Sequence, residues 1–199
     1  MSHPTNPAAV VITVPAWVDE LAFAAGLLHA DDEKMDLVVR LARRNVEEGG
    51  GPFAAAVFAG PRLMAAGVNR VLDSGLSIAH AEIVALMRAQ QVAQLQTALR
   101  APGKTSPEQT LVTSTEPCCQ CFGAVVWSGV TRLVCGATTS DAEAIGFDEG
   151  PKPDRWPEVL EVRGISVVLG VRRDDARLVL GEYSRRGGPI YGLRHPAIR

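Results

Sequence analysis

The sequence predicts an α/β domain, a three-layer α/β/α sandwich in which a mixed five-stranded sheet lies between helices. The prediction rests on two patterns: a hairpin of short apolar strands follows an amphipathic helix, and strands then alternate with helices along the chain. Such an order gives a sheet with both antiparallel and parallel neighbours, covered on both faces. We expect residues 1–199 to form a single domain, with an N-terminal arm at 1–14 and a C-terminal segment at 146–199 that contributes to the functional site.

The N-terminal part of the chain is predicted to form two helices and a hairpin. Residues 15–30 look helical, and the second helix takes Asp31 or Asp32 as its N-cap. The core-facing stripe of this second helix consists of Met35, Val38, Val39, Ala42 and Val46. The run Gly49-Gly50-Gly51-Pro52 ends it, and two strands at 53–59 and 63–68 are joined by a turn at Gly60-Pro61.

Helices and strands alternate in the rest of the chain. The third helix is predicted at about 80–92 and is followed by a polar stretch with Pro102, Gly103 and Pro107. The elements expected after it are a strand at 109–114, a helix at 118–128, a strand at 132–137, a short helix at 140–145, a Gly/Pro-rich loop at 146–157, a strand at 165–171 and a last helix at 173–185.

Composition and charge restrict the class of partner. The 199 residues are 47% hydrophobic and 21% charged, which is typical of a globular domain with a full core. Lysine and arginine (20) nearly balance aspartate and glutamate (22), so the net charge of −2 offers no polycation for a long nucleic acid. Small-molecule substrates are therefore favoured over tRNA or DNA.

The first residues and the cysteines indicate the compartment. The first fifteen residues lack a basic region followed by a long apolar stretch, and no later segment is apolar for long enough to span a bilayer. Three of the four cysteines fall within 118–121, which suits a metal site in a reducing compartment better than disulfides. We expect a cytoplasmic protein that does not bind membranes.

Two short motifs carry the chemistry: His80-Ala81-Glu82 and Pro117-Cys118-Cys119-Gln120-Cys121. Each alone is weak, since a lone His-x-Glu is more often a solvated helix start and a lone Cys-x-x-Cys can be redox-active or half of a structural zinc site. Together, in this order and each at a predicted helix start, they match the H-x-E and P-C-x-x-C signature of zinc deaminases. The sequence therefore predicts a zinc centre.

The chemistry explains why these residue types are required. One imidazole and two thiolates, from His80, Cys118 and Cys121, balance the charge of Zn²⁺ and leave a fourth position open for water. Coordination lowers the pKa of that water from 15.7 to roughly 7, and Glu82 is the group that takes the proton and later delivers it. His80 and Glu82 are two residues apart, and such residues point to different sides of a helix. In the first turn, however, side chains can project past the end of the helix, so both can reach one metal site. Pro117 suits a first turn, where its missing N–H costs nothing.

A purely structural zinc site would need a fourth protein ligand. The candidates are Cys119, Cys135, His3, His29 and His195. We interpret Cys119 as a packing residue that points away from the metal and Cys135 as a core residue of its strand. The three histidines are interpreted as solvated or loosely packed side chains.

At these motifs the sequence resembles the cytidine-deaminase superfamily, from about residue 33 to the C-terminus and most strongly at 80–82 and 115–121. Its layout is closest to the bacterial guanine deaminases of that superfamily, relatives of which also accept the triazine ammeline. The resemblance implies hydrolytic deamination of a nucleobase, with guanine converted to xanthine and ammonia as the first choice. It also implies one zinc ion per subunit and a homodimer.

The resemblance further implies a set of substrate-binding residues. Asn69 would bind the edge of the base, Phe53 would pack against its flat face, and Ala81 is placed with them. Tyr191, in the stretch 187–191, could fold over the site as part of a lid. Without the resemblance, Asn69 is equally well a turn residue, Phe53 is more often a core residue, and the stretch is equally well a surface tail.

The segment Gly146-Phe147-Asp148-Glu149-Gly150 resembles a motif in which a second carboxylate helps to protonate or orient the departing amine. Glu149 is the better match for this catalytic role, and Asp148 is held in reserve. Two acidic residues in a Gly/Pro loop are otherwise usually just solvated.

Other functions remain open at this point. Cys119-Gln120 replaces the Pro-Met pair often found between the ligand cysteines, which weakens the assignment of substrate. A cytosine, cytidine or ammeline deaminase would share the same metal chemistry, whereas a tRNA adenosine deaminase would need a basic surface. A zinc-stabilised binding module without activity is the alternative of another class, but such a module gains nothing from Glu82.

Overall fold

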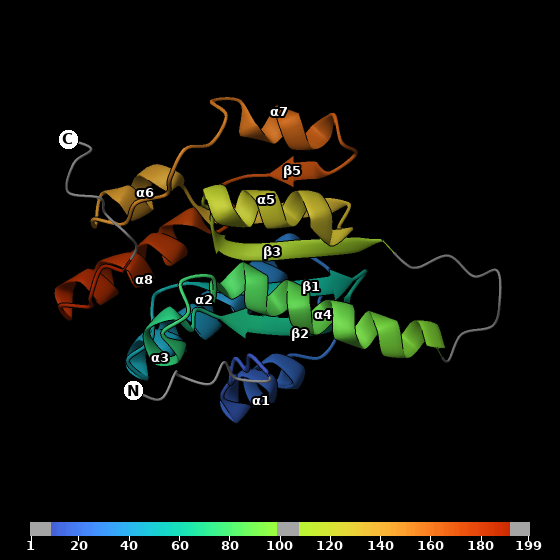
Figure 1. Cartoon of the computed structure of the whole chain (residues 1–199), viewed down its shortest axis with the longest axis horizontal. Coiled ribbons are helices and arrows are strands. Elements are labelled where there is room, and N and C mark those ends of the chain that lie inside the picture. The colour runs from blue at the N-terminus through green and yellow to red at the C-terminus, as the bar shows by residue number, and fades with distance from the viewer. Residues whose placement is uncertain (1–8, 99–107, 192–199) are drawn as a thin grey trace, which may run out of the picture.

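The computed structural model describes residues 9–98 and 108–191, and these form the three predicted layers around one sheet (Figure 1). The strand order is β2-β1-β3-β4-β5. The strands are β1 (Ala54–Ala59), β2 (Arg62–Val68), β3 (Gln109–Thr115), β4 (Arg132–Ala137) and β5 (Ser166–Val168). β1 is antiparallel to both β2 and β3, whereas β3, β4 and β5 are parallel, so the mixed five-stranded sheet is confirmed.

Helices cover both faces of the sheet, because successive strand residues point to opposite faces. Ala54, Ala56 and Phe58 of β1 pack into the core beneath one helix layer, and Ala55 and Val57 pack into the other core. The first layer contains α1 (Ala16–Ala24), α2 (Asp31–Glu47), α6 (Thr139–Glu143) and α8 (Arg173–Arg185). The second contains α4 (Ala81–Ala98), α5 (Cys119–Ser128) and α7 (Trp156–Glu161). Within the described ranges no helix has both the length and the apolar character needed to cross a bilayer.

The predicted elements agree with the structure best where apolar periodicity is long. β4 and α8 have the predicted bounds, and the predicted hairpin is formed by β1 and β2. Two short helices, α3 (Val71–Ser74) and α7, were not predicted, because one or two turns are too short for a helical repeat to stand out. α1 ends well before residue 30, and Gly26 follows it with a φ of +70°. The polar stretch with Pro102, Gly103 and Pro107 lies outside the described residues.

The predicted cap of the second helix is wrong. Ala30 occupies the N-cap position of α2, and the Glu33 carboxylate accepts hydrogen bonds from the backbone N–H groups of His29 (2.7 Å) and Ala30 (3.0 Å). Asp31 does not cap the helix, since its two oxygens accept hydrogen bonds from the guanidinium of Arg132 at 2.7 and 2.5 Å. This bidentate pair lowers the pKa of Asp31 and joins α2 to the start of β4.

One edge of the sheet gathers the ends of four strands. Ala54 at the start of β1 pairs with Val68 at the end of β2, and Thr115 at the end of β3 pairs with Ala137 at the end of β4. α4 and α5 both begin at this edge (Figure 1). Ligands in open α/β sheets are commonly bound beyond the carboxyl ends of parallel strands, so this edge is where a site is expected.

β2 and α4 approach each other closely at Gly67. A Cβ atom at this position would lie 2.5 Å from the backbone N of Ala85 and 2.6 Å from the backbone O of Ala81. Both of these atoms belong to the helix backbone, which cannot move away as a flexible side chain can. Gly67 therefore sets the distance between the sheet and the first turn of α4.

We expect Gly67→Ala to lower the free energy of unfolding by about 1–3 kcal/mol, the usual cost of overpacking a core. The measurement is urea denaturation followed by circular dichroism. The matched control is Gly123→Ala in α5, where an added Cβ meets nothing within 4 Å, and which should leave stability unchanged or raise it by up to about 1 kcal/mol. A Gly67→Ala protein as stable as the Gly123→Ala protein would contradict this account of the contact.

Candidate active site

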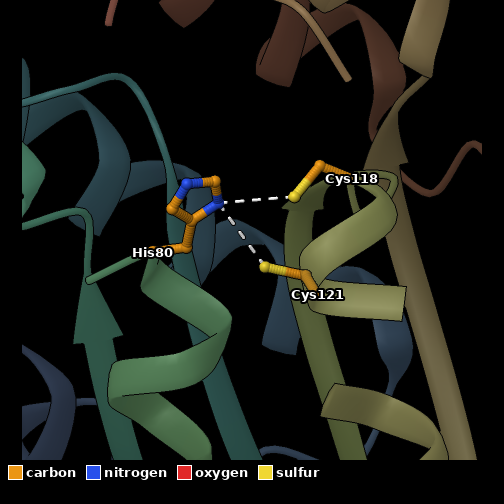
Figure 2. Close-up of side chains that lie close together, drawn as sticks. All are labelled: His80, Cys118 and Cys121. Atoms are coloured by element: carbon orange, nitrogen blue, oxygen red, sulfur yellow. Dashed lines mark hydrogen bonds between the residues drawn. The ribbon is translucent and has the colours of Figure 1, made fainter. Parts of the chain in front are cut away.

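The three predicted zinc ligands lie together between the beginnings of two helices. His80 immediately precedes α4, Cys118 is the N-cap of α5, and Cys121 lies in the first turn of α5. His80 Nδ1 is 3.4 Å from the Sγ atom of Cys118 and 3.6 Å from that of Cys121. Figure 2 shows the three side chains pointing toward one another, and their ligand atoms all lie within 4.8 Å of each other.

The donor set fits zinc by its chemistry as well as by its geometry. The hydrogen bond with Cys121 lowers the pKa of Cys118 to about 4, with a further contribution from His80. The same hydrogen bond, together with burial, raises the pKa of Cys121 well above its usual value. By themselves the two thiols therefore stabilise one thiolate and not two. A divalent cation removes this obstacle, because coordinating thiols are deprotonated outright.

The number of ligands is that of a catalytic zinc site, in which three protein groups leave a position open. Among the described residues, His80, Cys118 and Cys121 form the one group of three or more potential ligands. Cys119, Cys135 and His29 do not join it, and His3 and His195 lie outside the described residues.

Glu82 lies two residues after His80 in the sequence, and it is buried beside the ligands. Its side chain is 6% exposed, and Thr113 Oγ1 donates a hydrogen bond of 3.2 Å to its Oε1 atom. Burial raises the pKa of Glu82, and the negative charge of Cys118 adds to the shift. Because His80 precedes α4, the constraint on residues two apart in a helix does not apply, and both side chains face the same pocket.

A pocket at the edge of the sheet contains most of the predicted site residues. It is lined by Phe53, Asn69, His80, Glu82, Thr115, Glu116, Cys118, Phe147, Asp148, Glu149 and Tyr191. Of the predicted residues, Cys121 and Ala81 are missing from this lining. Cys121 reaches the site through the ligand cluster, whereas the Ala81 side chain is fully buried in the core. Substrate binding by Ala81 stays a prediction.

Three buried polar atoms of this pocket have no hydrogen-bond partner within the described chain. They are Asn69 Nδ2, Thr115 Oγ1 and the hydroxyl of Tyr191. The other side of the Asn69 amide is occupied, because its Oδ1 accepts a 3.1 Å hydrogen bond from the backbone N–H of Val71. Burying a polar group without a partner costs about 1–3 kcal/mol, and a polar ligand in the pocket would recover that cost.

Aromatic rings form one wall of the pocket. The ring of Phe147 lies edge-on to the rings of Phe53 and Tyr191, with centroids 4.9 and 5.1 Å apart, and stacks on Tyr183 at 5.9 Å. Tyr183 donates its hydroxyl hydrogen to the carbonyl of Pro189 at 2.5 Å, which holds the stretch 187–191 against the site. Of this stretch, Tyr191 lines the pocket, and the role of the stretch as a lid stays a prediction.

Glu149 is buried, whereas its neighbour Asp148 is not. Glu149 is 6% exposed, and burial raises its pKa to about 8, helped by the charges of Cys118 and Glu82. Its carbonyl accepts a 2.8 Å hydrogen bond from the N–H of Cys119, and a Cβ at Gly150 would lie 2.4 Å from Cys119 Sγ. Cys119 thus packs against this loop, as we interpreted it. Asp148 shapes the turn by accepting a 2.9 Å hydrogen bond from the N–H of Gly150.

Sequence reasoning did not identify Thr113, Thr115 or Phe147. The two threonines lie in β3, a strand that mixes apolar residues with several hydroxyl-bearing ones, so their spacing carries no functional signal. Phe147 belongs to the segment 146–150, in which only the two carboxylates were assigned a role. Its position directly before them in a Gly/Pro-rich loop, where an aromatic residue has little local reason to occur, is the signal that was available.

Comparison with known proteins agrees with this geometry. The model of the cytidine and deoxycytidylate deaminase zinc-binding region matches residues 28–137. A guanine deaminase from Nitrosomonas europaea has a similar structure, with a TM-score of 0.80, 46% identity and coverage of 92% of this chain and 100% of that one. The protein NE0047, solved in complex with 2,6-diaminopurine, gives a TM-score of 0.79 at 49% identity, with 92% and 97% of the two chains covered.

Curated relatives extend the comparison. The guanine deaminase of Bacillus subtilis (strain 168) is 35% identical over 115 residues, which are 56% of this chain and 67% of that protein. Some relatives are much longer, since the chain spans only 29% of a tRNA(Ile)-lysidine synthase from Deinococcus radiodurans to which it is 30% identical. The matched family region covers more than half of the chain and contains the three ligands and Glu82. The chain therefore belongs to the cytidine and deoxycytidylate deaminase family.

Proposed function

We propose that this protein is a zinc-dependent aminohydrolase that converts guanine and water to xanthine and ammonia. The observation that carries the proposal is the buried carboxyl of Glu82 beside a three-ligand metal group, in a pocket with unpaired polar atoms and an aromatic wall. A structural metal site has no use for such a carboxyl. The similarity to two guanine deaminases and to a protein that binds 2,6-diaminopurine supports a purine as the substrate.

The pocket suits a free heterocyclic base. Phe53, Phe147 and Tyr191 offer aromatic surface to a flat ring, and the free Nδ2 group of Asn69 donates to an acceptor on the edge of the base. The hydroxyls of Thr115 and Tyr191 can each donate or accept. The net charge of −2 offers little attraction to a nucleic acid, so a small molecule is favoured.

The two buried carboxyls divide the proton transfers between them. Zinc held by His80, Cys118 and Cys121 would activate a water molecule for attack on the amino-bearing carbon. Glu82, oriented by Thr113, takes the proton from that water onto a carboxylate oxygen and delivers it to the ring. Glu149, whose pKa of about 8 keeps it protonated near neutral pH, donates a proton to the departing amine, which leaves as ammonia, and regains a proton from the new C–OH group as the carbonyl of the product forms.

The experiment that tests this function is ammonia release by the purified zinc protein from guanine, guanosine, cytosine, cytidine, adenine and ammeline. We expect guanine to have the highest kcat/KM. A higher value for cytosine, cytidine or ammeline would replace guanine by that substrate, while leaving the deaminase chemistry in place. Zinc-loaded protein that releases ammonia from none of them would instead favour a zinc-stabilised binding module.

We also propose a homodimer. On the outer side of α4 and α5, the described residues Ile83, Leu86, Met87, Gln90, Ala124, Trp127 and Ser128 line a groove. The side chain of Trp127 is 87% exposed, and no charged residue lines this groove. Exposed apolar surface of this kind is typical of a surface covered by another protein, and a second copy fits because the superfamily resemblance implies dimers.

For the dimer, we expect sedimentation velocity to give twice the mass of the chain, and Trp127→Glu to give the single mass. A wild-type protein that sediments as a monomer at micromolar concentration would rule the dimer out. The control is Val162→Glu, at a residue that is 90% exposed elsewhere on the surface and should leave the mass unchanged.

We further propose that residues 1–199 act as one domain in the cytoplasm. The segment 146–191 supports the first point, since Phe147, Glu149 and Tyr191 line the same pocket as Phe53 and Glu82. All four cysteines are free thiols, which suits a reducing compartment where two of them can serve as ligands.

Glu82→Gln should retain zinc but lose deamination. The amide keeps the size of the side chain and its contact with Thr113, but it can no longer shuttle a proton, so we expect kcat to fall by at least about 10²–10⁴-fold. Steady-state ammonia release and zinc content of the same preparation are the measurements. Turnover equal to that of the wild type would refute the mechanism.

Glu149→Gln should reduce kcat by a smaller factor than Glu82→Gln. The leaving amine can be protonated more slowly by water, whereas the proton that Glu82 moves has no such substitute. The control is Glu161→Gln, at an exposed carboxylate of α7 outside the pocket lining, which should leave kcat unchanged. Full activity in Glu149→Gln would exclude Glu149 from this role.

Cys121→Ala should abolish stoichiometric zinc binding. Purified wild-type protein is expected to hold about one zinc ion per chain and Cys121→Ala less than a tenth of that, because one of only three protein ligands is lost. Atomic emission spectroscopy provides the measurement. Cys119→Ala is the internal control and should retain zinc; if Cys119→Ala lost zinc and Cys121→Ala kept it, the ligand assignment would be wrong.

A further inference from the structure

We propose that Lys152 is a positioning residue. It holds the loop that carries Glu149 (residues 147–153, the Glu149 loop) against the residues that lead into the ligand Cys118 (116–118, the metal-binding turn). The proposal rests on the function proposed above and concerns a residue outside the pocket lining. Lys152 bonds the residue before Cys118 and, through Thr139, the carboxylate of Glu116. We call Lys152, Thr139, Glu116 and the carbonyl of Pro117 the Lys152 clasp.

The ammonium group of Lys152 is held from three sides. Its Nζ atom donates a 2.6 Å hydrogen bond to the carbonyl of Pro117 and a 2.7 Å hydrogen bond to Thr139 Oγ1. The same atom lies 5.3 Å from the centroid of the Trp156 ring, within the range of a cation–π contact. These groups come from three different segments of the chain, so the clasp connects segments that are separate in the sequence.

Thr139 connects Lys152 to Glu116, which belongs to the metal-binding turn. Its hydroxyl accepts from Lys152 and donates to Glu116 Oε2 at 2.8 Å, while its backbone N–H donates to the same oxygen at 3.0 Å. Glu116 and Pro117 directly precede Cys118. The clasp therefore bonds this turn through a backbone carbonyl and through a side chain, on the two residues that lead into the metal ligand.

The clasp matters for Glu149 because the loop that carries it has little secondary structure of its own. Residues 147–153 form neither a helix nor a strand. One attachment to α5 lies at Glu149 and Gly150, through the N–H and the sulfur of Cys119. Lys152, only three residues beyond Glu149, supplies an attachment on the far side, and the ring contacts of Phe147 supply one before it. Attachments on both sides of one residue fix a short loop better than one, because each removes backbone freedom that the other leaves.

Lys152 also affects the charge balance of the site. Its positive charge acts to lower the pKa of Glu149, against the larger effect of burial. No described acidic side chain forms an ion pair with Lys152; it is bonded to a carbonyl and a hydroxyl instead. The loss of kcat expected on removal of Lys152 therefore rests on position, because the change in charge alone would keep Glu149 more fully protonated.

The test is a double-mutant cycle of Lys152→Met and Glu149→Gln, with kcat and KM for guanine measured in all four proteins. Methionine keeps an unbranched stem against Trp156 but lacks the charge and the donors. We expect Lys152→Met to lower kcat by about 10–100-fold, to change KM by less than about threefold and to retain zinc. Added to Glu149→Gln, it should cause no further loss, because both changes remove the same proton donor.

The matched control is Lys34→Met. Lys34 also lies over an aromatic ring, 5.4 Å from the centroid of Phe58, but it belongs to α2 and the other core. This variant should leave kcat unchanged. Multiplicative losses in the double mutant, or wild-type kcat in Lys152→Met, would overturn the proposal.

Amide hydrogen exchange tests the clasp without any turnover. We expect exchange at residues 146–152 to be at least about tenfold faster in Lys152→Met than in the wild type, with α8 unchanged. Wild-type exchange rates in this loop would overturn the proposal whatever the activity. If instead the wild-type zinc protein deaminates no base while the loop exchanges faster in Lys152→Met, the proposed function fails and the clasp itself stands.

Discussion

Crowding of negative charge at the beginnings of two helices is the constraint on which the site depends. Cys118, Cys121 and Glu82 are buried together, and the charge of Cys118 raises the pKa of both Cys121 and Glu82. Without a cation, burying these groups together would lower the stability of the folded chain. Both helices direct their positive ends at the cluster, which offsets part of the repulsion. The remaining excess of negative charge is what a divalent cation neutralises.

The sheet brings Phe53 and Asn69, for which we propose contact with the base, to this charge cluster by its mixture of strand directions. β3 and β4 deliver the metal-binding turn and α6 from their carboxyl ends, and the antiparallel β1 and β2 place Phe53 and Asn69 at the same edge. Buried Asn45 holds this corner, since its Nδ2 atom donates to the carbonyls of Gly51 (2.8 Å) and Asn69 (3.1 Å). An all-parallel sheet would have put the first strand's start at the opposite edge.

The metal ligands and Glu82 were predictable because coordination restricts residue type and spacing so strongly. The sheet and the long helices followed from apolar periodicity. The pocket wall was not predictable in the same way, since Phe147 and Thr115 acquire their roles only when distant segments fold together. The N-cap of α2 illustrates the same limit. Asp31 is a good cap by local rules, but the guanidinium of Arg132, 101 residues away, binds its carboxylate more strongly than a helix terminus does.

The C-terminal stretch contributes Tyr191 to the pocket. The hydroxyl of Tyr191 fills space directly over Gly51, where a Cβ would lie only 2.0 Å away, so the glycine run that ends α2 also admits this side chain. The hydroxyl is buried and unpaired, as are Thr115 Oγ1 and Asn69 Nδ2. Within the described chain these three polar groups are unsatisfied, and a ligand with matching donors and acceptors would satisfy them. A ligand without matching donors and acceptors leaves these three polar atoms buried and unpaired. Its binding is weakened by that desolvation cost, so such a pocket discriminates between heterocycles of similar size.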